Sequence, residues 1–296
     1  MIWIVGANGM LGRETTQILA ENGLKFYETD VEVDITDIGR VKEFIFNKTF
    51  SHIINCAAYT AVDAAEDDFE KAMAINRYGV ANLAFAAAAL DACLIHISTD
   101  YVFDGVLDAP LTEESVVNPI GIYGKTKLLG EYAIELSALK KYFIIRTAWL
   151  YGKHGKNFVN TMLNLMNVKE SVGVVADQWG SPTWARDLAK FITFVIKEGD
   201  DDYGTYHYSG DGKTNWYEFA VKIYEYGRKN GLIANECKIN ALTAEQYPAK
   251  AKRPKYSYLS KEKVKKTFEI NIPEWEDALE KYLDECRLLS SLENNF

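Results

Sequence analysis

The chain has 296 residues, of which 48% are hydrophobic and 25% charged, values typical of a globular protein of one large or two smaller domains. Its formal net charge of -9 argues against a general nucleic-acid or anionic-membrane surface. The four cysteines are far apart, and no segment has the roughly 18 uncharged apolar residues that a bilayer span needs. The sequence therefore predicts a cytoplasmic protein that binds neither nucleic acid nor membrane and has no disulfide framework or zinc site.

The first half of the chain alternates short apolar runs with longer segments of helical periodicity. We expect strands at 2–5, 24–30, 52–57, 93–98 and 142–148, and helices at about 10–22, 37–48, 69–91 and 121–138. Parallel strands need long connections and are covered on both faces, which suits these Ile- and Val-rich runs. The pattern predicts an α/β fold with a Rossmann-type doubly wound parallel sheet.

The second half is less regular. Short strands are expected at 172–177 and 205–210, helices at 184–199 and 215–231, a basic extended segment at 249–260, and two charged helices at the end. We expect a dinucleotide-binding domain over 1–152 and a smaller, interleaved domain, mainly for substrate binding, over 153–296.

A glycine-rich motif, "GANGMLG", lies between the first strand and the first helix. Glycines there permit a tight turn and a close approach of the backbone to a pyrophosphate, while the helix N-terminus offers free N–H groups to the phosphates. A plain structural turn is the alternative. The motif predicts coenzyme contacts from Gly6, Asn8, Gly9, Met10, Leu11, Gly12 and Arg13.

Asp30 stands at the end of the second expected strand. A carboxylate at that place can accept hydrogen bonds from the adenosine ribose and would repel a 2'-phosphate, which favours NADH. Arg13 could instead hold a 2'-phosphate, so the choice between NADH and NADPH stays open, and Asp30 could also be a plain surface charge. Asp34 and Ile35 are expected to flank the adenine.

The segment "STDYVFDG" follows the fourth expected strand, and "YGKTK" places Tyr123 and Lys127 four residues apart on the next helix. Ligands of open parallel sheets bind beyond the carboxyl ends of the strands, so Thr99 should face the coenzyme. A phenol has an ordinary pKa of about 10, and a nearby ammonium lowers it. We therefore expect Tyr123 to protonate a carbonyl oxygen that accepts hydride, with Thr99 orienting that oxygen and Lys127 supplying the charge and holding the nicotinamide ribose. An ordinary exposed helix pair is the alternative reading of Tyr123 and Lys127.

Together these motifs resemble the extended short-chain dehydrogenase/reductase superfamily and, more narrowly, the dTDP-4-dehydrorhamnose reductases. The similarity also includes "NCAAYTAVDAAE", "RTAWLYG", "VVADQWGSPTWARDLA" and "AKRPKYSYLS", and it covers roughly the first 260 residues. The resemblance implies that NADPH or NADH reduces the 4-keto group of dTDP-4-dehydro-6-deoxy-L-mannose, giving dTDP-L-rhamnose. It makes Thr99, Tyr123 and Lys127 the catalytic residues.

The same resemblance implies further contacts. Small residues at the end of the third strand would let the coenzyme approach, so Cys56, Ala57, Ala58 and Tyr59 are expected beside it. The expected substrate contacts are Val62, Asp63, Thr99, Asp100, Tyr101, Phe103, Tyr123, Trp149, Gln178 and Arg253. Arg253 would hold the diphosphate, because a guanidinium matches phosphate oxygens bidentately. A solvated basic face for Arg253 and a capped helix start for Asp63 are the alternatives.

Three other functions are compatible with parts of this pattern. One is a non-catalytic NAD(P)-binding regulatory subunit on the same fold, against which the intact catalytic residues argue. A second is a reductase of another nucleotide sugar. A third is an epimerase or dehydratase, which commonly has an Asp-Glu pair where this chain has Asp100 and Tyr101. No metal site is predicted, the four histidines are read as structural, and a homodimer stays an open alternative.

Overall fold

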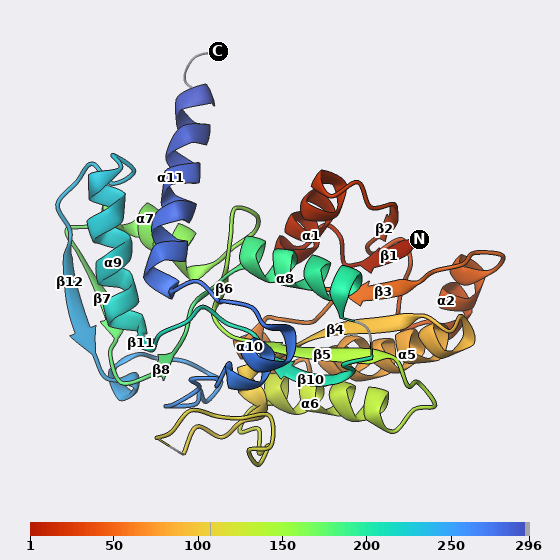
Figure 1. Ribbon diagram of the computed structural model, residues 1–296. Helices are drawn as coiled ribbons and strands as arrows, with labels where there is room; N and C mark the ends of the chain where they lie inside the picture. Colours follow the sequence, from red (N-terminus) through yellow and green to blue (C-terminus); the bar gives the residue numbers. More distant parts are fainter. Residues whose placement is uncertain (107, 200, 294–296) are drawn as a thin grey trace.

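The computed structural model describes residues 1–106, 108–199 and 201–293. Within these ranges a parallel sheet of six strands runs through the larger part of the molecule, in the order β10-β5-β4-β3-β1-β2 (Figure 1). Its strands are β1 (Ile2–Val5), β2 (Phe26–Thr29), β3 (His52–Asn55), β4 (Cys93–Thr99), β5 (Tyr142–Thr147) and β10 (Gly204–His207). The predicted α/β class and doubly wound parallel sheet are confirmed.

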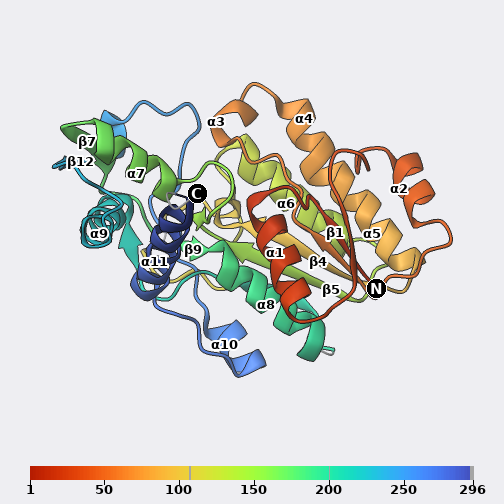
Figure 2. The same ribbon diagram turned by 90° about the horizontal axis from the view of Figure 1, so that it is seen from above.

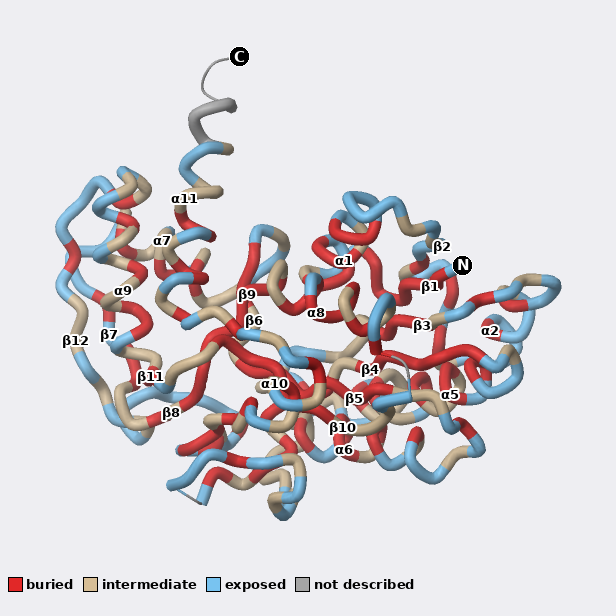
Figure 3. Tube along the Cα trace, viewed as in Figure 1, coloured by how far each residue is buried: buried red, intermediate tan, exposed pale blue. Residues whose placement is uncertain are grey.

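Helices cover both faces of this sheet, as Figure 2 shows from above. One face carries α1 (Met10–Glu21), α8 (Ala185–Glu198) and α10 (Glu262–Phe268). The other carries α2 (Ile38–Ile45), α5 (Val80–Ala89) and α6 (Ile122–Glu135). The strands are apolar on both faces because both are covered: Trp3 and Ile4 are neighbours in β1 and point to opposite sides, yet each is fully buried. The largely buried trace of β4 and β5 is visible in Figure 3.

Short elements connect the sheet to the helices near the carboxyl ends of β3 and β4. They are α3 (Val62–Ala65), α4 (Phe69–Met73), η1 (Ala74–Gly79) and the 3-10 turn η2 (Asp100–Val102). The single long helix expected over 69–91 is instead α4, η1 and α5, because η1 has the wider π-helical winding. Such bulges occur often at functional sites, and η1 carries Asn76, which is discussed below.

A second cluster of elements packs beside the sheet around its own apolar core. It holds the helices α7 (Phe158–Val168), α9 (Trp216–Lys229) and α11 (Trp275–Glu293) and the paired strands β7 (Ser171–Val175) and β12 (Lys238–Leu242). The two-residue strands β6 (Leu150–Tyr151), β8 (Trp179–Gly180), β9 (Thr183–Trp184) and β11 (Thr214–Asn215) and the turn η3 (Ala244–Gln246) complete the described elements. Asn157 and Asn215 cap α7 and α9, each accepting a hydrogen bond from a backbone N–H of the first turn.

The two halves of the chain share the main sheet. The segment 205–210 was grouped with the irregular second half, but β10 pairs with β5 in parallel and extends the main sheet, and α8 packs on α1. These elements lie beyond residue 152, so the chain crosses from one unit to the other more than once. Among the described residues, no helix is both long and apolar enough to cross a membrane.

Candidate active site

The glycine-rich turn between β1 and α1 is shaped by close backbone contacts. Gly6 has a φ of +76°, and a Cβ atom there would lie 2.6 Å from the nitrogen of Ala57. A Cβ on Gly12 would lie 2.2 Å from the carbonyl oxygen of Gly6. Only glycine fits both positions without moving backbone, which is the requirement that a dinucleotide loop places on these positions.

A cavity of about 580 Å³ opens beside this turn, at the carboxyl ends of β1, β2 and β3. It brings together nine residues that the sequence assigned to the coenzyme: Gly6, Asn8, Gly9, Asp30, Asp34, Ile35, Cys56, Ala57 and Ala58. Met10, Leu11, Gly12 and Arg13 form the first turn of α1, whose N-terminus follows the loop. The cavity, the glycines and the helix N-terminus fit a dinucleotide, and these residues are the ones that would hold it.

Asp30 already has a partner in the glycine loop. Its Oδ2 accepts a hydrogen bond from the backbone N–H of Asn8 (2.9 Å), and Asn8 O accepts one from Arg13 Nε (3.1 Å). One carboxylate therefore holds the glycine-rich loop while it also lines the cavity. This arrangement favours neither NADH nor NADPH.

The loop that follows β3 is held by Asn76 of η1. Asn76 Oδ1 accepts a hydrogen bond from the backbone N–H of Tyr59 (2.8 Å), and its Nδ2 donates to Tyr59 O (3.1 Å) and Thr126 Oγ1 (3.0 Å). Tyr59 thereby keeps a fixed backbone, while its hydroxyl donates to Asp68 (3.4 Å). The buried amide of Asn76 thus ties the loop after β3 to α6.

The predicted catalytic residues meet between β4 and α6. The rings of Tyr101 and Tyr123 lie edge to face with centroids 5.5 Å apart, and Thr99 ends β4 next to Asp100. Thr99 Oγ1 donates to Asp100 Oδ1 (3.0 Å) and accepts from the backbone N–H of Tyr101 (3.2 Å). In this arrangement the hydroxyl proton of Thr99 points to the carboxylate of Asp100. The hydroxyl must therefore rotate away from Asp100 before it can donate to a substrate carbonyl.

Burial raises the pKa of Tyr123 to about 12, offset in part by its hydrogen bond with Thr99. This direction is opposite to the lowered phenol pKa that the sequence predicts from the nearby ammonium of Lys127. Lys127 Nζ instead donates to Ile97 O (2.6 Å) and lies 3.3 Å from His96 Nε2. Burial lowers the pKa of this lysine to about 8. A phenol with this pKa keeps its proton near neutrality, but it gives that proton up less readily than an acid whose pKa lies close to the working pH.

Asp100 is a second titratable group at the same place. It is 2% exposed, and burial raises its pKa to about 6, although contacts with Ser257 and Thr99 lower it in part. A carboxyl with this pKa changes its charge close to neutral pH. It also lies close enough to the phenol of Tyr123 to help raise the pKa of that group.

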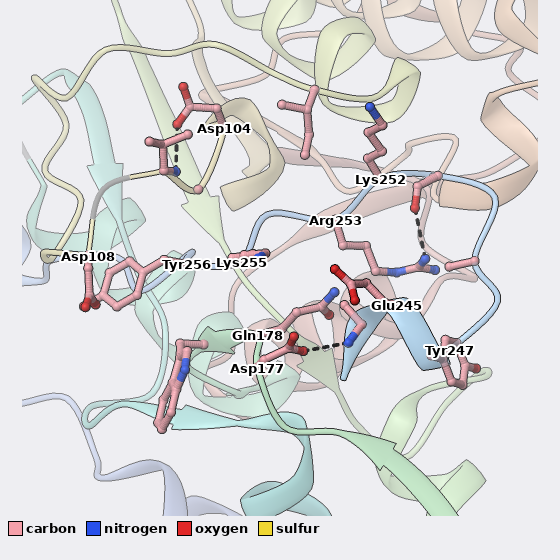
Figure 4. Close-up of a pocket in the computed structure, with 17 residues that line it drawn as sticks. Asp104, Asp108, Asp177, Gln178, Glu245, Tyr247, Lys252, Arg253, Lys255 and Tyr256 are labelled. Atoms are coloured by element: carbon pink, nitrogen blue, oxygen red, sulfur yellow. Dashed lines mark hydrogen bonds between the residues drawn. The ribbon is translucent and has the colours of Figure 1, made fainter. Parts of the chain in front are cut away.

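A cavity of about 880 Å³ lies between the sheet and the second cluster of elements (Figure 4). Gln178, Lys252, Arg253 and Lys255 line it, together with Asp177 and Tyr247. Arg253 Nη2 donates to Asp63 Oδ2 (2.8 Å), and Asp63 Oδ1 accepts from the backbone N–H of Ala251 (2.9 Å). This hydrogen bond lowers the pKa of Asp63, so the pair is charged near neutral pH. The structure thus joins two predicted substrate residues that are 190 positions apart.

Two predicted substrate residues differ in their surroundings. Trp149 has a φ of +48° and stacks on Trp216 with ring centroids 3.7 Å apart. It also lies against Gly180, where a Cβ atom would come within 2.8 Å of the indole.

The side chain of Phe103, a predicted substrate contact, is 1% exposed. It packs with Val102, Leu111 and Leu128 in a small core. A substrate contact of Phe103 therefore stays a prediction, and its ring contributes to this small core. Val62 begins α3 beside Asp63.

Two residues at the site were not found from the sequence. His96 was read as structural, yet it contacts Lys127, and only the pairing of β3 with β4 brings it beside Asn55. In the sequence, the only indication that His96 lies near the site is weak: it stands two residues before Ser98 in the same expected strand. Tyr247 lines the larger cavity from a loop that gave no sequence signal. Among the described residues, no group of three or more His, Cys, Asp or Glu side chains could hold a metal ion.

Comparison with known proteins identifies the family. The family model described as "RmlD substrate binding domain" matches residues 1–288. The chain belongs to this family. A dTDP-4-dehydrorhamnose reductase of Aggregatibacter actinomycetemcomitans is 38% identical, with 93% of this chain and 96% of that protein covered.

Solved structures agree with this assignment to the RmlD family. A dTDP-4-dehydrorhamnose reductase of Clostridium acetobutylicum is 43% identical with a TM-score of 0.91, covering 97% of this chain and 99% of the other. A second one, from Bacillus anthracis in complex with NADP, is 39% identical with a TM-score of 0.90 and covers 96% and 98%. The predicted resemblance is confirmed, as is the expectation of an NAD(P)H-dependent oxidoreductase.

Proposed function

We propose that this protein reduces the 4-keto group of dTDP-4-dehydro-6-deoxy-L-mannose to give dTDP-L-rhamnose, with Tyr123 as proton donor. The observation that carries the proposal is the half-buried Tyr123, whose phenol lies beside Thr99 at the carboxyl end of β4, in a chain of the RmlD family. The relatives named dTDP-4-dehydrorhamnose reductase support the substrate. The NADP complex of the Bacillus anthracis relative supports NADPH as coenzyme, with NADH as the alternative.

The coenzyme, when bound, supplies the hydride that reduces the sugar carbonyl carbon. Gly6, Asn8 and Gly9 would hold its pyrophosphate side, and Lys127 its nicotinamide ribose. Tyr123 gives its phenolic proton to the carbonyl oxygen as negative charge develops there, and solvent later returns a proton to the phenolate. Thr99, with its hydroxyl turned from Asp100, orients the same oxygen.

The larger cavity suits the nucleotide part of such a substrate. Arg253, held by Asp63, presents a guanidinium that matches diphosphate oxygens bidentately. Gln178 is buried, and its amide offers both a donor and an acceptor to a base. Tyr101 and Trp149 present aromatic faces on the side toward the sugar. Asp100 and Val62 complete the proposed sugar contacts.

We also propose that residues 1–152 bind mainly the coenzyme and residues 153–296 mainly the substrate. The cavity beside β1 to β3 and the Gln178 and Arg253 side of the larger cavity support this division. A cytoplasmic location is also proposed, supported by cysteines that form no disulfide within the described residues.

The first experiment measures oxidation of NADPH and NADH by the purified protein with dTDP-4-dehydrorhamnose and with its GDP- and UDP-linked relatives. We expect turnover with the dTDP sugar and at least about tenfold lower kcat/KM with the others. Equal rates with another nucleotide would refute the substrate assignment. Binding of coenzyme without oxidation on any keto sugar would favour the regulatory subunit.

A second experiment tests the proton donor. Tyr123→Phe removes one hydroxyl and keeps the ring, so we expect kcat to fall by about two to four orders of magnitude while the coenzyme Kd stays within about twofold. Tyr132→Phe, an exposed tyrosine on the same helix, is the matched control and should retain full activity. Unchanged turnover by Tyr123→Phe would remove Tyr123 as the donor.

A further inference from the structure

A buried ion pair lies behind the proposed active site, between α6 and β5. Glu131 of α6 is 1% exposed, and Arg146 of β5 is 5% exposed. Arg146 Nη2 donates to Glu131 Oε2 (2.7 Å), and its Nε donates to Oε1 and Oε2 (3.1 and 3.2 Å). A desolvated pair adds little to stability, because the cost of taking both charges out of water offsets their attraction. Its place beside the site points to another role.

Donors from two strands fix the Glu131 carboxylate in one position. Besides Arg146 of β5, the hydroxyl of Ser98 in β4 donates to Glu131 Oε1, and Ser98 directly precedes Thr99. A guanidinium bound through two nitrogens together with a hydroxyl leaves a carboxylate little freedom. The other terminal nitrogen of Arg146, Nη1, lies 3.5 Å from His207 Nε2 in β10. Burial lowers the pKa of His207 to about 3, so this ring adds no charge near neutral pH.

The fixed carboxylate lies one helical turn from the proposed catalytic lysine. Lys127 stands four residues before Glu131, so both side chains lie on the same face of α6. Lys127 is 1% exposed, and its Nζ donates to Ile97 O (2.6 Å). Burial lowers the pKa of Lys127 to about 8, and Glu131 is the first of the groups that raise it. Burial thus favours loss of the lysine proton, and the carboxylate opposes that loss.

Three further titratable groups around Lys127 carry no charge near neutral pH. Burial raises the pKa of Cys56, after β3, and of Tyr123, on α6, to about 12 each. In β4, His96 Nε2 lies 3.3 Å from Lys127 Nζ, and burial holds the pKa of this ring well below its ordinary value. Asp100, in η2, acts on the pKa of Tyr123. Among the described groups that shift the pKa of the lysine, the negative charge therefore comes from the carboxylate one turn along α6.

We propose that Glu131 is a positioning residue: its carboxylate, fixed by donors from β4 and β5, keeps the buried Lys127 protonated, so that an ammonium is in place when coenzyme and sugar bind. The catalytic meaning rests on the proposed function. A phenolate forms on Tyr123 as the sugar oxygen takes its proton, and a positive charge already present in the site favours that step. The same ammonium would hold the nicotinamide ribose.

The first test follows Lys127 directly and needs no substrate. Protein labelled with ¹³C at the lysine ε carbon is titrated by NMR, and the spectrum of Lys127→Arg assigns the signal. We expect wild-type Lys127 to be mainly protonated at neutral pH, with a pKa of about 8. In Glu131→Gln this pKa should fall by about one unit. Glu135→Gln, which removes the same charge one turn further along α6, should leave it unchanged. A neutral lysine in the wild type, or an unshifted pKa in Glu131→Gln, would overturn the proposal.

A double variant separates this electrostatic role from a purely structural one. Glu131→Gln alone leaves the buried guanidinium of Arg146 without its partner, so its stability should fall. Glu131→Gln combined with Arg146→Met removes both charges and should recover stability. The pKa of Lys127 should stay below its wild-type value in both variants, because both lack the carboxylate. A pKa that returns to the wild-type value together with stability would overturn the proposal, and this variant gives the answer if the single one does not fold.

The pH profile of kcat shows whether the reaction depends on this charge. In Glu131→Gln the alkaline limb should lie about one pH unit lower, with kcat near the wild-type value at acidic pH and about tenfold lower at alkaline pH. A displaced α6 would instead lower kcat at every pH and leave the limb in place, a result that contradicts the proposal. Failure of every substrate with the wild-type protein would refute the proposed function and leave the NMR titration to decide the role of Glu131.

Discussion

At the scale of single residues, the site is controlled by burial. Tyr123, Lys127 and Asp100 each lie where water cannot solvate a charge well, and burial is the first cause of the pKa change in all three. The phenol and the carboxyl hold their protons more tightly than usual, and the lysine holds its proton less tightly. The residue types could be assigned from the motifs, but the pKa values depend on neighbours that only the fold supplies.

Asp100 gives a prediction about stability against pH. Its pKa in the fold, about 6, is higher than the ordinary 3.8, so the folded protein binds the proton more tightly than the unfolded chain. The stability that this proton gives is complete below pH 3.8 and is lost as pH rises through about 6. Asp100→Asn replaces the titrating carboxyl by an amide, so the variant does not lose this stability as the pH rises. Relative to wild type, its free energy of unfolding should rise by about 2 to 3 kcal/mol between pH 4 and pH 8, at about 1.4 kcal/mol per pKa unit.

Urea denaturation at several pH values measures this difference. The exposed Asp202→Asn is the matched control, and its difference from wild type should be constant with pH. A constant difference for Asp100→Asn as well would show that the Asp100 carboxyl titrates normally.

At the scale of elements, α6 carries the site and is placed by its glycines. It bears Tyr123, Lys127 and Glu131 on consecutive turns, facing β4 and β5. Gly124 and Gly130 let the helix approach neighbouring backbone, because a Cβ on either would lie 2.1 and 2.2 Å from the carbonyl oxygens of Tyr101 and Asn76. The sequence predicted this helix and its Tyr and Lys. It did not predict the close packing, which depends on Tyr101 and Asn76, 23 and 54 residues earlier in the chain than the two glycines.

Gly124→Ala tests whether this packing sets the catalytic geometry. The added methyl group meets a backbone carbonyl that cannot move independently, so α6 must shift from η2 and carry Tyr123 away from Thr99. We expect kcat to fall by roughly 10² and stability by about 1 to 3 kcal/mol. Kinetics with parallel thermal unfolding measures both. Leu136→Ala, 88% exposed at the end of the same helix, should change neither, and full activity in Gly124→Ala would contradict the argument.

At the scale of the whole molecule, distant segments of the chain meet beside the larger cavity. Asp63 in α3 and Arg253 in the extended basic segment form the charged pair that joins them. The sequence identified both residues, but as separate substrate contacts. Their pairing could not be predicted because it requires the folded path of the chain between them.

We expect that weakening the Asp63–Arg253 pair raises the KM for the nucleotide sugar and leaves the KM for the coenzyme almost unchanged. Asp63→Asn weakens a charge-assisted hydrogen bond that holds the guanidinium, so the KM for the nucleotide sugar should rise by about tenfold or more, with the coenzyme KM within about twofold. Asp67→Asn is the matched control, because Asp67 pairs with Lys250 between the same two segments but is well exposed. A similar rise in KM for both variants would mean that general loss of negative charge, and not the position of Arg253, is responsible.

The sequence by itself determined the parallel sheet and the tight glycine turn after β1, and it supplied the proposed catalytic residues, because each depends on local periodicity, on glycine sterics or on a motif within a few residues. The tertiary structure decided that 204–207 joins the main sheet, that Phe103 is core and that His96 touches Lys127. These depend on which strands pair and which segments meet across the fold. Such contacts are set by packing between residues far apart in the chain, and local patterns carry no information about them.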